Sequence, residues 1–233
     1  MVKKTFNTAI VFFLFCFTAS DPSSALNLSG PGRPMIAVNG ATKPELTMDI
    51  VSVSYDNSLN RLEVTLKNWD TSTPSYKYSE SNQFIPGVQI SLFMGPESQQ
   101  VKLFDGILST CTPHFNQYEP STLTFVATGS AQPAKTNLIQ MSYGADLLQF
   151  DPTITSKNDT IQCTGQTDGN PDIQTGTSIF VTGVGQRYSR TYRVTKTLHT
   201  FDSSKGYKTQ FTATTGTAPE TPDLLIQRKR SSY

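Results

Sequence analysis

Residues 181–211 read VTGVGQRYSRTYRVTKTLHTFDSSKGYKTQF and contain two alternating strand patterns. The first pattern runs from Tyr192 to Leu198 and the second from Tyr207 to Phe211, with mainly apolar or β-branched side chains at every second position. Such alternation is typical of strands that bury one face. The intervening Asp202-Ser-Ser-Lys-Gly206 has the composition of a turn. This stretch therefore predicts a β-hairpin.

Short strand patterns continue along the chain before this hairpin. Strands are expected at Met35–Val38, Leu46–Ile50, Val51–Tyr55, Leu62–Leu66, Val88–Leu92, Val101–Phe104, Ile107–Thr112, Leu123–Ala127, Leu138–Tyr143, Leu147–Phe150, Thr160–Thr164 and Ser178–Thr182. The alternation changes parity between Ile50 and Val51, which predicts a β-bulge. Asn39-Gly40 and Asp56–Ser58 are turn sequences. Regularly spaced short strands predict an all-β sandwich or barrel.

The N-terminus has the pattern of a secretory signal peptide. Two lysines precede an apolar run at Thr8–Ala19, which is shorter than the roughly 20 residues that span a bilayer. We assign residues 1–25 to this leader and residues 26–34 to a linker. The two β domains are then expected at 35–129 and 138–215. A linker at 130–137 separates them, and a basic tail at 216–233 follows, with a short helix candidate at Pro222–Arg228.

The composition argues against a strongly basic nucleic-acid-binding protein and favours a strand-rich one. The 233 residues include 19 Lys+Arg and 18 Asp+Glu, so the net charge is +1 and a strongly basic nucleic-acid binder is not expected. Only 16% of the residues are charged, whereas 32 are threonine. This composition favours strands over solvent-facing helices.

The cysteines leave one question open. If the leader is removed, Cys111 and Cys163 remain in a chain bound for an oxidising compartment. They could form a disulfide that closes a long loop, or they could remain free cysteines on buried strands. The sequence does not place the two residues in contact.

Candidate catalytic and ligand-binding groups have simpler structural interpretations. His114 and His199 are expected to be half-buried strand residues, because no nucleophile motif accompanies them. Asp168-Gly-Asn-Pro-Asp172 lacks the full ligand set of a calcium loop, and Gly183-Val-Gly185 lacks the lysine and helix of a phosphate loop. We therefore expect no catalytic residues, no metal site, no cofactor, no nucleic-acid partner and no enzymatic activity.

Two stretches of the sequence resemble the phage late-control protein D family, the baseplate hub proteins of contractile tails, which are related to type VI secretion spikes. The first runs from Arg33 to Gly129 and includes Leu103-Phe-Asp-Gly-Ile-Leu-Ser. The second runs from Leu138 to Thr214 and ends in the hairpin described above. The resemblance implies that these positions shape that family's closing hairpin: Gly183, Gly185, Tyr188, Tyr192, Val194, His199, Phe201, Gly206, Tyr207 and Phe211.

The resemblance implies two small hub-like β-barrels with short connections, in a shortened form of the family. It also implies a structural protein that assembles with tail tube, spike or other baseplate proteins as a homotrimer. Its location would be a virion or a tail-like particle. Phage tails need no secretion signal, so the leader favours an alternative: an exported β-barrel binding module of the same ancestry, secreted or periplasmic and not inserted in the membrane after cleavage.

Overall fold

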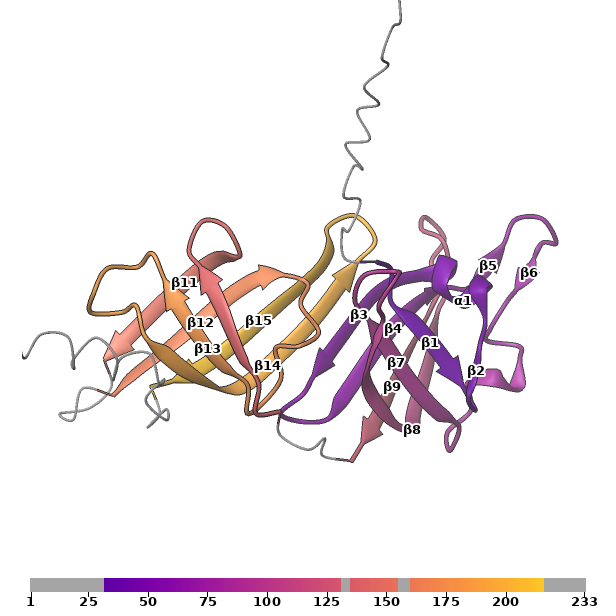
Figure 1. Ribbon diagram of the computed structural model, residues 1–233. Coiled ribbons are helices and arrows are strands. Elements are labelled where there is room, and N and C mark those ends of the chain that lie inside the picture. The colour runs from indigo at the N-terminus through magenta and orange to yellow at the C-terminus, as the bar shows by residue number, and fades with distance from the viewer. Residues whose placement is uncertain (1–31, 131–134, 155–159, 216–233) are drawn as a thin grey trace, which may run out of the picture.

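The computed structural model describes residues 32–130, 135–154 and 160–215 (Figure 1). The predicted leader, most of the linker that follows it and the basic tail with its helix candidate lie outside these residues. We refer to residues 32–130 as the N-terminal half and to the described residues from 135 to 215 as the C-terminal half. Figure 1 shows the two halves side by side, each with strands curled around its own core.

The N-terminal half consists of nine strands and two short helical segments. In chain order these are β1 (Met35–Val38), β2 (Ala41–Thr42), α1 (Pro44–Asp49), β3 (Ile50–Asp56), β4 (Arg61–Lys67), β5 (Trp69–Asp70), β6 (Ser75–Tyr76), the 3-10 helix Asn82–Phe84, β7 (Gln89–Met94), β8 (Val101–His114) and β9 (Thr122–Gly129). The C-terminal half adds β10 (Leu138–Ser142), β11 (Leu147–Ile154), β12 (Ile161–Asp168), β13 (Ser178–Thr182), β14 (Thr191–Asp202) and β15 (Gly206–Thr214). The prediction of an all-β fold with little helix is confirmed.

Thirteen of these strands form one sheet that runs through both halves. Its order is β11-β12-β15-β14-β3-β4-β9-β8-β7-β1-β2, with β13 also paired to β14 and β10 paired to β13. Among the strand pairs of the described residues, β10 and β13 alone run parallel. The β5–β6 hairpin forms a separate two-stranded sheet. The halves are therefore joined by main-chain hydrogen bonds between β14 and β3.

Each half has its own hydrophobic core. The first core is formed mainly by alternate residues of β1, β3, β4, β7, β8 and β9, and the second by residues of β10–β15. Two aromatic residues of the C-terminal hairpin, Phe201 and Tyr207, belong to the first core, whereas Phe211 belongs to the second. The hairpin β14–β15 therefore contributes side chains to both cores.

The expected strand at Leu46–Ile50 is wrong, because Pro44–Asp49 forms the helix α1. Proline is favoured at the first turn of a helix, where no amide donor is needed. In α1 Leu46 is fully buried, whereas Met48 is 65% exposed. The two residues do not share a buried strand face, so their spacing of two was misleading. The bulge predicted beside Ile50 is confirmed, since the β3–β4 register shifts between Ile50 and Ser52.

The predicted turns and the closing hairpin are confirmed. Asn39 and Gly40 both have positive φ between β1 and β2, and β14 pairs with β15 from Arg193 to Asp202. The two short strands expected at 101–104 and 107–112 are one strand, β8, whose pairing with β9 shifts between Leu108 and Thr110. No helix among the described residues is both long and apolar enough to span a bilayer.

Candidate functional site

The two halves meet along one edge of β14, where β14 pairs with β3; we call this junction the seam. The first residues of β14 pair with β13, from Ser178↔Arg193 to Phe180↔Thr191. The last residues pair with β3, from Leu198↔Asp56 to Asp202↔Ser52. One strand edge is therefore divided between the two halves, while the other edge is paired to β15 along most of its length.

A buried histidine lies at the centre of this seam. His199 is fully buried, and its Nδ1 lies 2.8 Å from the hydroxyl of Tyr207 and 3.2 Å from Oγ1 of Thr209. Its ring stacks on Tyr55 of β3, with the centroids 6.1 Å apart. Burial lowers the pKa of His199 to about 3. The imidazole is therefore neutral near pH 7 and links β14 to both neighbouring strands.

Hydrogen bonds extend this seam into the connection before β13. Asn57 Nδ2 donates to the Tyr55 hydroxyl at 3.1 Å. Asn57 Oδ1 accepts from the amide of Thr175 at 3.3 Å and from its hydroxyl at 2.5 Å. Residues 118 positions apart in the sequence are thus held together by a buried amide. Polar contacts of this kind fix the relative placement of packed elements.

The ten positions singled out in the closing hairpin fall into three groups. Gly183, Gly185 and Gly206 have φ of 81°, 80° and 75°. Gly183 and Gly185 lie in the connection between β13 and β14, and Gly206 is the first residue of β15. Tyr188, Tyr192, Val194 and Phe211 pack in the second core, where the Tyr192 hydroxyl donates to the Tyr188 carbonyl at 2.8 Å. His199, Phe201 and Tyr207 lie at the seam or in the first core.

The other candidate groups are separated in the structure. His114 is exposed at the end of β8, so neither histidine is half-buried as expected. Asp168 pairs with Lys208 and Asp172 pairs with Lys135, at 2.5 and 3.3 Å. Among the described residues, no group of three or more His, Cys, Asp or Glu side chains could hold a metal ion.

Cys111 and Cys163 are both free thiols in the structure and lie in different halves. Cys163 is 1% exposed in the second core, and its burial raises the pKa of the thiol to about 12. Cys111 is only partly buried on β8, and burial raises its pKa as well. Thiol reagents attack the thiolate of an accessible cysteine. The difference in exposure therefore predicts different reaction rates for Cys111 and Cys163.

We expect Cys163 of the folded protein to react at least about a hundredfold more slowly than Cys111, because its labelling requires unfolding of the second core. The measurement is labelling with a maleimide, followed by peptide mapping. In denaturant both residues should react at similar rates. Equal rates in the native protein would contradict the placement of Cys163.

A polar groove of about 360 Å³ lies across β11, β12, β15 and β14 on the side facing away from the second core. Gln149, Gln166 and Gln210 are register neighbours in it, and Gln210 Nε2 donates to Gln166 Oε1 at 3.0 Å. Lys196 and Asp56 also line the groove. Its amides, hydroxyls and charges can form hydrogen bonds but offer no activated nucleophile.

The N-terminal half ends in a cluster of exposed aromatic rings. Trp69 of β5 contacts Tyr76 of β6 edge-to-face at 5.2 Å, and Tyr76 contacts Phe115 at 4.9 Å. Trp69 is 38% exposed and Phe115 59% exposed. Tyr118, in the loop between β8 and β9, is 88% exposed. Hydrogen bonds from the hydroxyl and amide of Ser72 lower the pKa of Asp70 to about 2, which keeps this neighbouring carboxylate charged.

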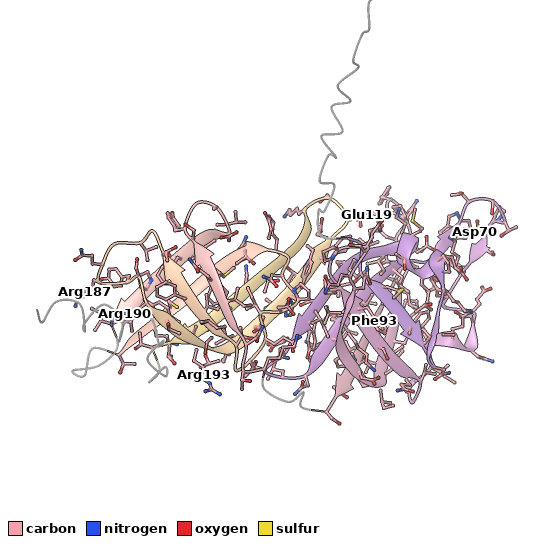
Figure 2. All side chains as sticks on the ribbon, viewed as in Figure 1. Asp70, Phe93, Glu119, Arg187, Arg190 and Arg193 are labelled. Carbon is pink, nitrogen blue, oxygen red and sulfur yellow. The ribbon has the colours of Figure 1, made fainter. Side chains whose placement is uncertain are left out.

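The C-terminal half carries arginines at its opposite end. A cavity of about 200 Å³ is lined by Ile154, Ile161, Arg187 and Arg190. Figure 2 shows Arg187 and Arg190 at the far end of the molecule from Asp70. Neither this cavity nor the aromatic cluster was anticipated from the sequence, because the contributing residues are distant along the chain.

Two solved structures of phage tail proteins share the fold of this chain. A 43 kDa tail protein of prophage MuSo2 from Shewanella oneidensis aligns over 78% of this chain and 96% of its own, with a TM-score of 0.50 and 7% identity. A tail protein from Neisseria meningitidis MC58 aligns over 80% and 97%, with a TM-score of 0.52 and 7% identity. The fold resembles that of phage tail proteins. The tail-protein resemblance inferred from the sequence is thus confirmed at the level of the fold.

Three further comparisons complete this result. The E. coli c3393 protein, described as a component of the type VI secretion system with structural similarity to T4 bacteriophage tail proteins gp27 and gp5, aligns over 80% of this chain and 77% of its own. Its TM-score is 0.51 at 8% identity. The family model of the Alg8 N-terminal domain matches residues 32–132, which covers the N-terminal half. A comparison with curated proteins finds no match.

Proposed function

We propose that this protein is a non-enzymatic baseplate hub or tube-adaptor protein of a contractile phage tail or a tail-like injection machine. The observation that carries the proposal is the likeness of its fold to two phage tail proteins over nearly their whole length. Fold alone does not fix function, so the proposal also draws on the surfaces of the molecule. These offer exposed aromatic rings and charged ends for protein contacts.

Within tail proteins, the closing hairpin favours the late-control protein D family as a functional analogue. In this role the protein joins tail tube, spike or other baseplate proteins. Three copies, each with two β-rich halves, would present six such units around one axis, which would suit the junction of a six-fold tube with a three-fold spike. The seam at β14–β3 would keep the two units of each copy in a fixed relation.

The test is a pull-down of the C-terminally tagged protein from cells that make it natively, with partners identified by mass spectrometry and the eluate viewed by negative-stain microscopy. Tube, sheath or spike proteins, with rings or tube ends in the images, are expected. Recovery of the chain alone would contradict the proposal.

An exported binding module is the second candidate function, and the apolar run Thr8–Ala19 after two lysines favours it. The intact mass of the natively made protein separates the two. Loss of about 19 to 25 N-terminal residues would support export, as expected for signal-peptide cleavage. Retention of Met1, or a start near Met35, would support the tail role.

A further inference from the structure

The two halves carry opposite net charge. Residues 32–130 contain nine Asp and Glu against six Lys and Arg. The described residues 135–154 and 160–215 contain seven Lys and Arg against five Asp. Opposite net charge on the two halves favours contact between unlike halves of neighbouring copies and disfavours contact between like halves.

The aromatic end has the side chains of a protein interface. We define it as Trp69, Asp70, Tyr76 and Phe115. The Tyr76 ring makes edge-to-face contacts with both Trp69 and Phe115, yet Trp69 and Phe115 remain substantially exposed. Trp and Tyr are enriched among the residues that dominate binding energy at interfaces. The carboxylate of Asp70, which follows Trp69 in β5, adds negative charge at this end.

The arginine end has the complementary chemistry. We define it as Ile154, Ile161, Arg187 and Arg190, which line the cavity of about 200 Å³. Within the described part of the chain neither arginine forms an ion pair, and the buried Nε of Arg190 has no hydrogen-bond partner. Guanidinium groups over apolar walls suit aromatic rings flanked by carboxylates.

We propose that the aromatic end of one copy docks on the arginine end of the next copy. The ends lie on opposite sides of the molecule in Figure 2, so they cannot meet within one chain. Aromatic-to-aromatic or arginine-to-arginine contact would bring like charges together. A head-to-tail contact uses two different surfaces and therefore builds a ring when its rotation closes. This inference rests on the proposed role as an assembling tail component and names the contact that assembly would use.

The test uses two variants of the natively processed protein, each with one end removed. R187E/R190E abolishes the arginine end, and W69S/F115S abolishes the aromatic end. The control K196E/K205E makes the same change of charge at two exposed lysines outside both ends. Circular dichroism and thermal unfolding check that all variants are folded. Sedimentation velocity then measures the mass of each protein over a range of concentrations and salt.

The wild type and the control should associate, with a dissociation constant that rises with salt. Each end variant alone should remain monomeric, with association weakened at least about tenfold. An equimolar mixture of the two end variants should form a 1:1 dimer and nothing larger, since only one intact pair of ends is present. Dimers of R187E/R190E alone would indicate contact between aromatic ends and overturn the proposal. Wild type that stays monomeric would also overturn it, yet recovery with tail particles would leave the proposed function standing.

Discussion

Replacing Tyr207 by alanine is expected to destabilise the protein by about 3–5 kcal/mol, the usual cost of truncating a large buried aromatic side chain. Tyr207 is 1% exposed and packs in the first core although it belongs to the C-terminal hairpin. Its ring also lies directly against Gly169, and its hydroxyl is hydrogen-bonded to His199. The measurement is urea unfolding followed by far-UV circular dichroism.

Both halves should lose stability together in this variant, because β14–β15 serves both cores. The matched control is Tyr118→Ala, which removes a ring that is 88% exposed and should change stability by less than about 0.5 kcal/mol. A Tyr207→Ala protein as stable as the wild type would show that the hairpin does not contribute to the first core in solution.

Acid should destabilise the protein through His199 before most carboxylates titrate. The pKa of this histidine is about 3 in the folded state and near 6.5 when unfolded. Between these values the unfolded chain binds a proton that the folded protein does not, so stability rises with pH and is lost as the pH falls. The loss attributable to His199 between pH 6.5 and 4.5 is expected to be about 2 kcal/mol.

The measurement compares urea unfolding at these two pH values for the wild type and His199→Gln. Glutamine keeps a polar group near Tyr207 but cannot titrate, so the variant should lack this part of the pH dependence. Carboxylates contribute equally to both proteins and cancel in the difference. The same slope in the two proteins would contradict a neutral, buried His199.

Strand patterns were predictable from the sequence because alternation follows from the geometry of a half-buried strand. It identified the β3–β4 bulge and the β14–β15 hairpin. Alternation was misleading at Leu46 and Met48, where only two apolar positions spanned a helix of six residues. Pro44 was the available signal for a helix start.

The seam and the two ends could not be predicted, because they depend on long-range pairing. Asn57 and Thr175 are brought together only when β14 pairs with β3. Trp69 and Phe115 lie far apart in the sequence and meet through the β5–β6 hairpin and the end of β8. Single residues of these sites look like ordinary strand or loop positions until the fold groups them.

The most direct test of the proposed hub role is immunogold labelling of the tagged protein in particles purified from cells that make it natively, viewed by electron microscopy. Gold at one end of the tail tube, and absent along its length, is the expected result. Gold absent from the particles, with the protein free in the exported fraction, would contradict the hub role and favour a binding module that acts outside the cytoplasm.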